Sequence, residues 1–343
     1  MRINKLRLLV YMILISSLFI ISCHTIRTPQ HNTSAGAANE TDLNSLVLST
    51  FGNERNIDMS LFKKAVLDIP YAGTSNIRQT LDIVYPSAGQ APYKVIVLFH
   101  GGGWIAGNKR SETLASIFQA IFQGYALISV NYRLSNEVRW PKPLHDAKAA
   151  IRFIRANRDK YQLDTENLVV WGVSAGGHIA EMLAATNRKP TFEDFTMGSA
   201  KASSTVQGVV AWSSVTDLSA LTDLGTPLAN KVMGYDVRAN KSKTHDANPI
   251  NLVNSQYPPI LMVHGTNDQV VPYQQSVDML KKVNDLTGKE TAQLITFEGA
   301  GHSDPVIKTN ESVAKNLDFI DLILYGGNNP YRDTSYVDIR IKP

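Results

Sequence analysis

Cysteine is almost absent from this sequence, since Cys23 is the only one among 343 residues. A chain with one cysteine cannot form an internal disulfide, so no disulfide framework can hold its fold together. The sequence also lacks a Lys/Arg cluster of the kind that binds nucleic acid, and we expect no nucleic-acid partner. Its 43% hydrophobic and 19% charged residues exclude a disordered or collagen-like chain and indicate a globular protein with a substantial core.

An apolar run long enough to span a membrane is missing as well. Residues 8–21 are apolar apart from two serines, but a membrane-spanning helix needs about 20 such residues. Three basic residues precede the run, and a basic head before a short apolar stretch is typical of a secretory signal. We therefore expect residues 1–22 to be removed as a signal peptide. Their removal takes away three basic and no acidic residues, which lowers the formal net charge from +4 to +1.

The signal ends in Ile20-Ile21-Ser22-Cys23, which resembles a bacterial lipobox, where a small residue precedes a cysteine that is lipidated and becomes the mature N-terminus. This pattern predicts a lipoprotein exported to the bacterial cell envelope. Cys23 would anchor it on a periplasm-facing membrane and provide its only contact with lipid. The alternative is an ordinary signal peptide with an accidental cysteine. Residues 23–60 are rich in Thr, Asn, Ser, Ala and Gly, and this composition indicates a flexible tether.

Residues 61–325 have the pattern of one α/β domain, and residues 326–343 look like a C-terminal tail. Two short segments, Ala65–Tyr71 and Gln79–Tyr85, flank a turn-like Gly-Thr-Ser-Asn sequence and predict an antiparallel hairpin. Continuous apolar runs follow, of the kind that forms strands buried on both faces of a parallel sheet. These runs are 94–99, 126–130, 168–171, 206–212, 260–263 and 292–297.

Stretches with helical spacing of apolar residues separate these runs. They are residues 111–123, 143–161, 176–186, 273–286 and 311–325. Alternation of strand and helix predicts a mostly parallel, doubly wound sheet of eight strands with helices on both faces. The irregular region 217–251 interrupts the alternation and is a candidate cap or substrate-facing insertion.

The pentapeptide Gly172-Val173-Ser174-Ala175-Gly176 matches the G-x-S-x-G pattern of a nucleophile elbow. An apolar run precedes it and a helical stretch follows it, which is the strand–turn–helix context that the pattern requires. Glycine on either side of the turn allows strand and helix to approach where a Cβ would clash. We therefore predict that Ser174 is a catalytic nucleophile. The alternative is a serine in an ordinary glycine-rich turn.

The sequence His100-Gly101-Gly102-Gly103-Trp104 directly follows the first apolar run of the domain. Three glycines leave backbone N–H groups unshielded, and such groups can stabilise the oxyanion of a tetrahedral intermediate. We predict an oxyanion hole from Gly102, Gly103 and the N–H of Ala175, the residue after the nucleophile. His100 is interpreted as a structural residue that orients the loop. Trp104 is a candidate substrate-binding residue that lines the acyl pocket, or else a residue of the core.

An activated serine needs a base and an acid that orients the base, in the chain order nucleophile, acid, histidine. His302 fits as the base because it lies in a loop of small residues after the run 292–297. Asp268 fits as the acid because it follows the preceding run, although an Asp in such a loop often only holds a turn. The alternatives to these two are Asp217, Asp304, His178, His245 and His264.

Five motifs together resemble the hormone-sensitive-lipase-like esterases, and most closely the bifunctional feruloyl and acetyl xylan esterase group. They are His100-Gly-Gly-Gly-Trp, Asn131-Tyr-Arg-Leu, His145-Asp-Ala-Lys-Ala-Ala-Ile-Arg-Phe, Trp171-Gly-Val-Ser-Ala-Gly-Gly-His and Gly265-Thr-Asn-Asp-Gln-Val-Val-Pro. The resemblance covers about residues 65–325 and implies an α/β-hydrolase fold with His145 and Asp146 in structural roles. It implies hydrolysis of carboxylic esters without metal or cofactor. The implied substrate is a small ester or an acylated oligosaccharide, with acetyl or feruloyl groups removed from plant xylan.

Other functions are compatible with the same fold, because a fold does not determine its substrate. One alternative is an arylformamidase or a peptidase. Peptidases of the prolyl-oligopeptidase kind usually carry a large propeller domain, which the short segment before the first motif cannot supply. Another alternative is a catalytically dead, carbohydrate-binding lipoprotein, although the presence of all triad and oxyanion elements argues against it.

Overall fold

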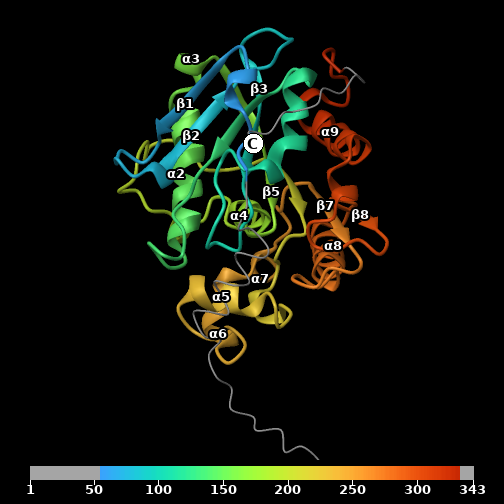
Figure 1. The fold of residues 1–343 in the computed structure, drawn as a ribbon. Helices are drawn as coiled ribbons and strands as arrows, with labels where there is room; N and C mark the ends of the chain where they lie inside the picture. The colour runs from blue at the N-terminus through green and yellow to red at the C-terminus, as the bar shows by residue number, and fades with distance from the viewer. Residues whose placement is uncertain (1–54, 333–343) are drawn as a thin grey trace, which may run out of the picture. The chain divides into compact units, whose positions relative to one another are not determined.

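The core of the protein is one eight-stranded sheet, antiparallel at one edge and parallel elsewhere (Figure 1). The computed structural model describes residues 55–332. The strand order is β1-β2-β4-β3-β5-β6-β7-β8. β1 (Ala65–Pro70) and β2 (Thr80–Val84) form the predicted antiparallel hairpin, and β2 also pairs antiparallel with β4 (Ala126–Val130). The remaining pairs are parallel and involve β3 (Tyr93–Phe99), β5 (Leu163–Val173), β6 (Gly208–Trp212), β7 (Ile260–Gly265) and β8 (Ala292–Phe297).

The apolar runs of the sequence become the central strands because both faces of the sheet are covered. β4 and β6 are buried along their whole length, and so is the second half of β3. The predicted mostly parallel, eight-stranded sheet is therefore confirmed. β5 begins earlier than the apolar run 168–171 suggests, because its polar first residues still pair with β3, where Lys94 lies opposite Asp164 and forms an ion pair at 2.5 Å.

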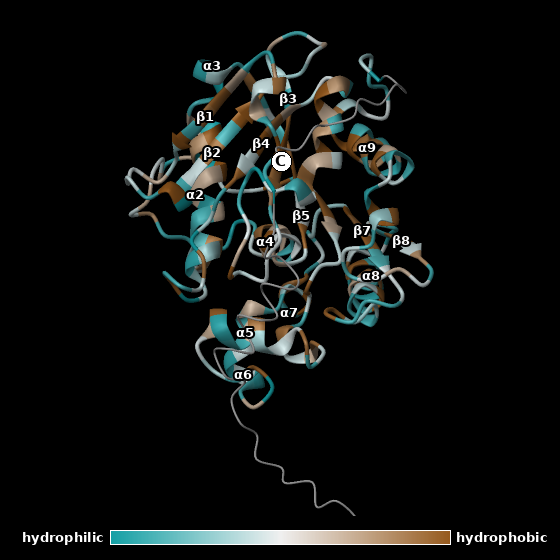
Figure 2. Cartoon of the chain, viewed as in Figure 1, coloured by the Kyte–Doolittle hydropathy of each residue, from teal (hydrophilic) through white to brown (hydrophobic). Residues whose placement is uncertain are grey.

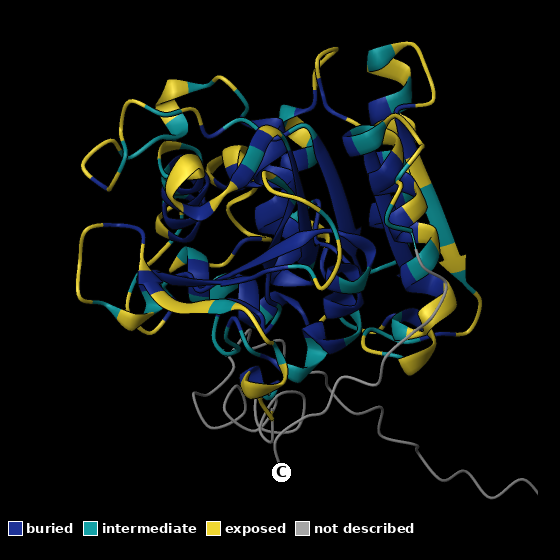
Figure 3. Ribbon diagram, turned by 90° about the horizontal axis from the view of Figure 1, so that it is seen from above, coloured by how far each residue is buried: buried dark blue, intermediate teal, exposed yellow. Residues whose placement is uncertain are grey.

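Helices cover both faces of the sheet, as predicted. α2 (Lys142–Ala156), α4 (Ala175–Ala185) and α8 (Gln274–Thr287) contribute to the hydrophobic core on one face. η3 (Glu112–Gln123), which is a 3-10 helix, and α9 (Asn310–Tyr325) contribute to the core on the other. A short α3 (Arg158–Tyr161) follows α2. Figure 2 shows hydrophobic residues concentrated in the strands, and Figure 3 shows that exposed residues lie mainly on outer helix surfaces and loops.

The irregular region 217–251 folds into short helices that pack on the loops at the carboxyl ends of the strands. Leu228 of α5 (Thr226–Met233) contacts Gly103 in the loop after β3. The Thr222 hydroxyl donates to the carbonyl oxygen of Val270, in the loop after β7, at 2.9 Å. The other helices of the region are η5 (Leu218–Ala220), α6 (Lys241–Thr244), η6 (His245–Ala247) and α7 (Pro249–Leu252). This insertion therefore supports the loops in which the candidate catalytic residues lie.

Packed structure extends beyond residues 61–325 at both ends of the domain. Ile57 is 1% exposed and its N–H donates to the Arg110 carbonyl at 2.7 Å. After α9, the Asn329 amide donates to Asp321 at 2.8 Å, and Tyr331 lies against Gly124. The predicted signal peptide, Cys23 and most of the predicted tether lie outside the described residues. Within the described part of the chain, none of the helices is both long and apolar enough to cross a bilayer.

One acidic side chain lies in the core without a hydrogen bond of standard geometry. Glu181 of α4 is 0% exposed, and both of its carboxyl oxygens lack a partner among the described residues. Burial raises the pKa of Glu181 to about 8, and the nearby Ser214 hydroxyl offsets only part of this shift. A buried carboxyl that keeps its proton avoids the large cost of a buried unpaired charge.

This buried carboxyl should make the protein less stable as pH rises from about 4.5 to about 8. Below this window both states bind the proton, whereas within it the unfolded chain releases the proton and the folded chain retains it. The free energy of unfolding then falls with a slope approaching ~1.4 kcal/mol per pH unit. We expect Glu181→Gln to remove this slope, and its free energy of unfolding in urea to exceed that of the wild type by ~4 kcal/mol at pH 8.

A matched control separates this effect from a general change in charge. Glu290 is exposed, so Glu290→Gln should leave the slope unchanged. A wild-type slope in Glu181→Gln would show that Glu181 is already ionised in the folded protein.

Candidate active site

Ser174 lies on a tight turn between β5 and α4, in a backbone conformation that is rare for residues other than glycine (φ 53°, ψ −117°). The flanking glycines make this turn possible. A Cβ added to Gly172 would lie 2.1 Å from the Gly176 carbonyl oxygen, and one added to Gly176 would lie 2.1 Å from the Phe99 carbonyl oxygen. The strain of the turn is the local cost of presenting the serine hydroxyl at the end of the sheet.

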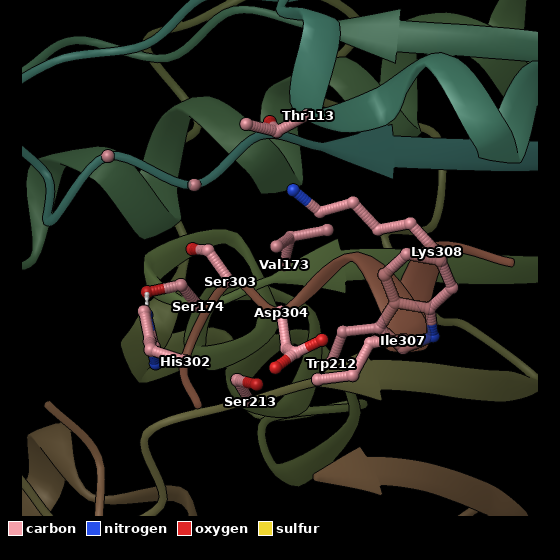
Figure 4. Close-up of a pocket in the computed structure, with 12 residues that line it drawn as sticks. Thr113, Val173, Ser174, Trp212, Ser213, His302, Ser303, Asp304, Ile307 and Lys308 are labelled. Atoms are coloured by element: carbon pink, nitrogen blue, oxygen red, sulfur yellow. Dashed lines mark hydrogen bonds between the residues drawn. The ribbon is translucent and has the colours of Figure 1, made fainter. Parts of the chain in front are cut away.

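A chain of hydrogen bonds joins the three residues predicted as nucleophile, base and acid. The Ser174 hydroxyl lies 2.8 Å from His302 Nε2. Figure 4 marks this hydrogen bond with a dashed line. His302 Nδ1 lies 2.7 Å from Asp268 Oδ2. Asp268 follows β7 and His302 follows β8, and both strands end at the same edge of the sheet as β5. Residues far apart in the sequence therefore meet at hydrogen-bonding distance.

Asp268 is held in place by four hydrogen bonds. Oδ1 accepts from the N–H groups of Val270 and Val271 at 2.8 and 2.9 Å, and Oδ2 accepts from His264 Nε2 and His302 Nδ1. Burial alone would raise the pKa of Asp268, but the hydrogen bonds from His264 and His302 lower it well below its usual value. The carboxylate is therefore ionised at neutral pH and can orient an imidazole.

His264 is a member of the site that the sequence suggested only as a buried alternative base. Its Nε2 lies 3.0 Å from Asp268 Oδ2 and 3.1 Å from the Val271 carbonyl oxygen. Because Nε2 faces two acceptors, it carries the proton, and Nδ1 accepts from the Ser276 hydroxyl at 2.7 Å. His264 thus donates to the acid rather than to the serine. The signal for this role is the spacing of four residues between His264 and Asp268, with the histidine in a strand and the aspartate in the loop that follows.

The loop after β3 brings backbone N–H groups to Ser174. Gly101 and Gly102 line the pocket at Ser174, whereas Gly103 does not and packs against Leu228. Gly102 has φ +109°, and an added Cβ would lie 2.2 Å from the Ala106 carbonyl oxygen, so only glycine fits there. The N–H groups of Gly102, Gly103 and Ala175 donate to no backbone oxygen within residues 55–332. Ala175 begins α4, where N–H groups have no partner within the helix.

His100 and Trp104 both pack inside the molecule at the ends of this loop. His100 stacks on Tyr132 with ring centroids 4.4 Å apart, and its Nδ1 donates to the Gly101 carbonyl at 2.7 Å. Burial lowers the pKa of His100 to about 3, so the ring is neutral and serves to hold the loop. Trp104 is 2% exposed, lies edge-on to His178 and is not part of the pocket lining. The structure therefore places Trp104 in the core rather than in a substrate-binding position.

The alternative acids and bases occupy other positions. His178 is buried and lies 2.8 Å from the Ala247 carbonyl oxygen. Burial lowers the pKa of His178 to about 4. His245 is exposed and pairs with its neighbour Asp246. The Asp217 carboxylate accepts from Ser219 and Asn248, and the Asp304 carboxylate accepts from the Val306 N–H and caps a 3-10 helix, η7 (Pro305–Lys308). Of the alternatives to the predicted acid and base, only Asp304 lines the pocket at Ser174.

The pocket at Ser174 lies between the start of η3 and η7 (Figure 4). Val173, Trp212 and Ile307 contribute apolar side chains to its lining, and Thr113 and Lys308 also line it. The space open to the centre of a water-sized group measures about 20 Å³. A mostly apolar cavity beside a serine that is hydrogen-bonded to a histidine is suited to attack on a bound carbonyl group.

Sequence comparison finds curated relatives that carry esterase names. The chain is 32% identical over 204 residues to the probable carboxylic ester hydrolase LipM of Mycobacterium tuberculosis, an alignment that covers 57% of this chain and 46% of the relative. It is 29% identical to the esterase LipC of the same organism, with 62% and 53% covered. The chain therefore spans about half the length of the curated relatives it matches.

Comparison with solved structures finds the same fold in a carbohydrate esterase and in a bifunctional protein. A truncated carbohydrate esterase from gut microbiota has a TM-score of 0.72 and 29% identity, covering 79% of this chain and 100% of that one. A bifunctional GH43-CE protein of Bacteroides eggerthii has a TM-score of 0.68 and 28% identity, covering 74% of this chain and 34% of that one. The family model BD-FAE matches residues 81–283. Because this match takes in the loop after β3, the elbow and Asp268, the chain belongs to the BD-FAE family of α/β-hydrolase esterases, the bifunctional feruloyl and acetyl xylan esterase group.

Proposed function

We propose that this protein hydrolyses carboxylic esters through an acyl-enzyme on Ser174. The observation that carries the proposal is the continuous hydrogen-bonded series from the Ser174 hydroxyl through His302 to the ionised Asp268. In this arrangement the carboxylate fixes the tautomer with the proton on Nδ1 and leaves the Nε2 lone pair facing the hydroxyl. The order of the three residues in the chain is that of α/β-hydrolases.

Acylation follows from this geometry. His302 Nε2 takes the proton of the Ser174 hydroxyl as the oxygen attacks the ester carbonyl, and Asp268 stabilises the resulting imidazolium. Backbone N–H groups of the glycine loop and of Ala175 donate to the oxyanion of the tetrahedral intermediate. His302 then gives its proton to the alcohol oxygen as the bond between that oxygen and the carbonyl carbon breaks. The alcohol leaves and the acyl group remains on Ser174.

Deacylation repeats these steps with water. His302 removes a proton from the attacking water, a second tetrahedral intermediate forms, and its collapse breaks the bond to Ser174. The proton returns to the serine oxygen, the carboxylic acid leaves, and the free enzyme is restored.

We propose an acylated plant polysaccharide, such as xylan, as the substrate, with acetyl or feruloyl groups as the acyl part. Membership of the BD-FAE family supports this choice, and so does the structural similarity to a carbohydrate esterase from gut microbiota. Hydrolysis of at least one of acetylated xylan and methyl ferulate should exceed that of a peptide anilide or formylkynurenine. The reverse preference would favour a peptidase or an arylformamidase.

Covalent labelling tests the proposed nucleophile directly. A fluorophosphonate probe should label the wild-type protein once, and peptide mass spectrometry should place the label on Ser174. The Ser174→Ala variant should remain unlabelled, whereas Ser199→Ala, an exchange at a serine outside the pocket, should label like the wild type. A folded wild-type protein that never labels would favour a binding protein without catalytic activity.

We also propose that Cys23 carries a lipid anchor in the bacterial envelope, as its lipobox-like context indicates. Expression in a bacterial host fed an alkyne fatty acid should label the wild type and not Cys23→Ser. Equal labelling of both proteins would rule out Cys23 as the site.

A further inference from the structure

Two of the side chains that line the cavity beside Ser174 are held in fixed positions by the core. Trp212 is 1% exposed, its Nε1 donates to Asn316 Oδ1 at 3.1 Å, and its ring lies edge-on to Trp171 with centroids 5.2 Å apart. The Trp212 carbonyl accepts from the Ser174 N–H at 2.8 Å, so the backbone of Trp212 is hydrogen-bonded to that of the nucleophile. Ile307 of η7 is 3% exposed and also lines the cavity.

The cavity is small compared with the acyl groups it could receive. Its space for the centre of a water-sized group is about 20 Å³, whereas a single water needs ~10–15 Å³ measured in the same way. A group about the size of a methyl therefore fits. The aromatic ring and side chain of a feruloyl group do not, since ligands of that size occupy pockets of ~300 Å³ or more.

The acyl half and the alcohol half of the ester must lie on different sides of Ser174, and only one of them can enter the cavity. The alcohol half of a polysaccharide ester continues into a polymer, which a cavity of this size cannot enclose. It must therefore extend toward solvent, where His302 Nε2 can protonate its oxygen. The acyl substituent is the half that enters the cavity between Trp212 and Ile307.

We infer that this protein is an acetylesterase whose small acyl site, lined by Trp212 and Ile307, excludes feruloyl groups. The inference rests on the proposed function and narrows its substrate to short acyl groups. A longer acyl chain would have to displace Trp212 or Ile307. Forcing extra methylenes into a packed site strains the side chains around it and is unfavourable.

The size limit can be measured with esters that differ only in acyl length. We expect kcat/KM for p-nitrophenyl esters to fall at least about 100-fold from acetate to hexanoate. Acetate should be released from acetylated xylan, and methyl ferulate should not be cleaved measurably. Ile307→Ala should raise the ratio of kcat/KM for butyrate over acetate at least about tenfold, because it removes three carbon atoms from the cavity lining.

Val306→Ala provides the matched control, since Val306 lies in the same short helix but is 39% exposed and outside the cavity. Its butyrate-to-acetate ratio should equal that of the wild type. If Ile307→Ala does not fold, Ile307→Val should give a smaller shift in the same direction. The wild-type series alone remains a test that needs no variant.

The possible results separate this inference from the proposed function. Similar rates on acetate and hexanoate, or efficient cleavage of methyl ferulate, would overturn the acetyl selectivity and leave the esterase intact. An unchanged ratio in a folded Ile307→Ala would also overturn it. A protein that cleaves no ester and takes no fluorophosphonate label would overturn the proposed function itself.

Discussion

Replacing Ser174 by alanine is expected to lower kcat for p-nitrophenyl acetate by about a millionfold. The Ser174 hydroxyl oxygen is the only protein atom that forms a covalent bond to the acyl group in the proposed mechanism. Without it, His302 has no oxygen to deprotonate, and the acyl-enzyme cannot form. The remaining oxyanion donors can still bind the transition state for attack by water, so activity about 1,000- to 10,000-fold above the uncatalysed reaction should persist.

The design of this experiment must exclude loss of folding as the cause. Ser174 adopts a strained backbone conformation with φ 53°. An alanine at this position would carry a similar backbone strain, so the variant should unfold at a temperature close to that of the wild type. Ser199→Ala, at a serine outside the pocket, should retain activity within about threefold. If kcat of Ser174→Ala stayed near the wild-type value, the nucleophile would be a different residue.

The glycine-flanked turn shows what sequence reasoning could predict. The G-x-S-x-G pattern requires a strand before it and a helix after it, and both were visible as an apolar run and a helical stretch. Because parallel strands end at one edge of a sheet, residues after the later strands were expected near Ser174. The predicted chain order then led to Asp268 and His302, which lie within hydrogen-bonding distance in the structure.

The features that sequence reasoning could not provide depend on contacts between distant segments. Whether Trp104 faces a ligand or the core depends on its packing against His178, 74 positions later in the chain. The pocket brings together Trp212, the last residue of β6, and Ile307 in η7, and no local sequence pattern predicts that they line the same cavity. Which glycines of the loop after β3 face Ser174 depends on the insertion, since Leu228 covers Gly103.

The second large effect is expected from Asp268→Asn, which should lower kcat by about 10,000-fold while leaving the fold in place. In the wild type, Oδ2 accepts from both His302 Nδ1 and His264 Nε2. An asparagine that keeps its carbonyl at Oδ1, facing the N–H groups of Val270 and Val271, must place its NH₂ group where Oδ2 was. That group is a donor, and it would face two imidazole donors.

His302 can escape this conflict only by moving its proton from Nδ1 to Nε2. The Nε2–H would then face the Ser174 hydroxyl, and a nitrogen that already carries a proton cannot act as the base. The loss should therefore appear in kcat rather than in KM, since the ester pocket is untouched. Fluorophosphonate labelling should slow in parallel, because it needs the same activated hydroxyl.

Asp304→Asn is the control for this exchange, because Asp304 is a carboxylate in the same pocket that caps η7 rather than contacting His302. A cap of this kind contributes about 1 kcal/mol to stability, and an asparagine side-chain oxygen can accept the same N–H. Asp304→Asn should therefore lose less than about tenfold in kcat. If the two variants lost activity equally, the carboxylate would act through the general field of the pocket, and the tautomer of His302 would not be what Asp268 controls.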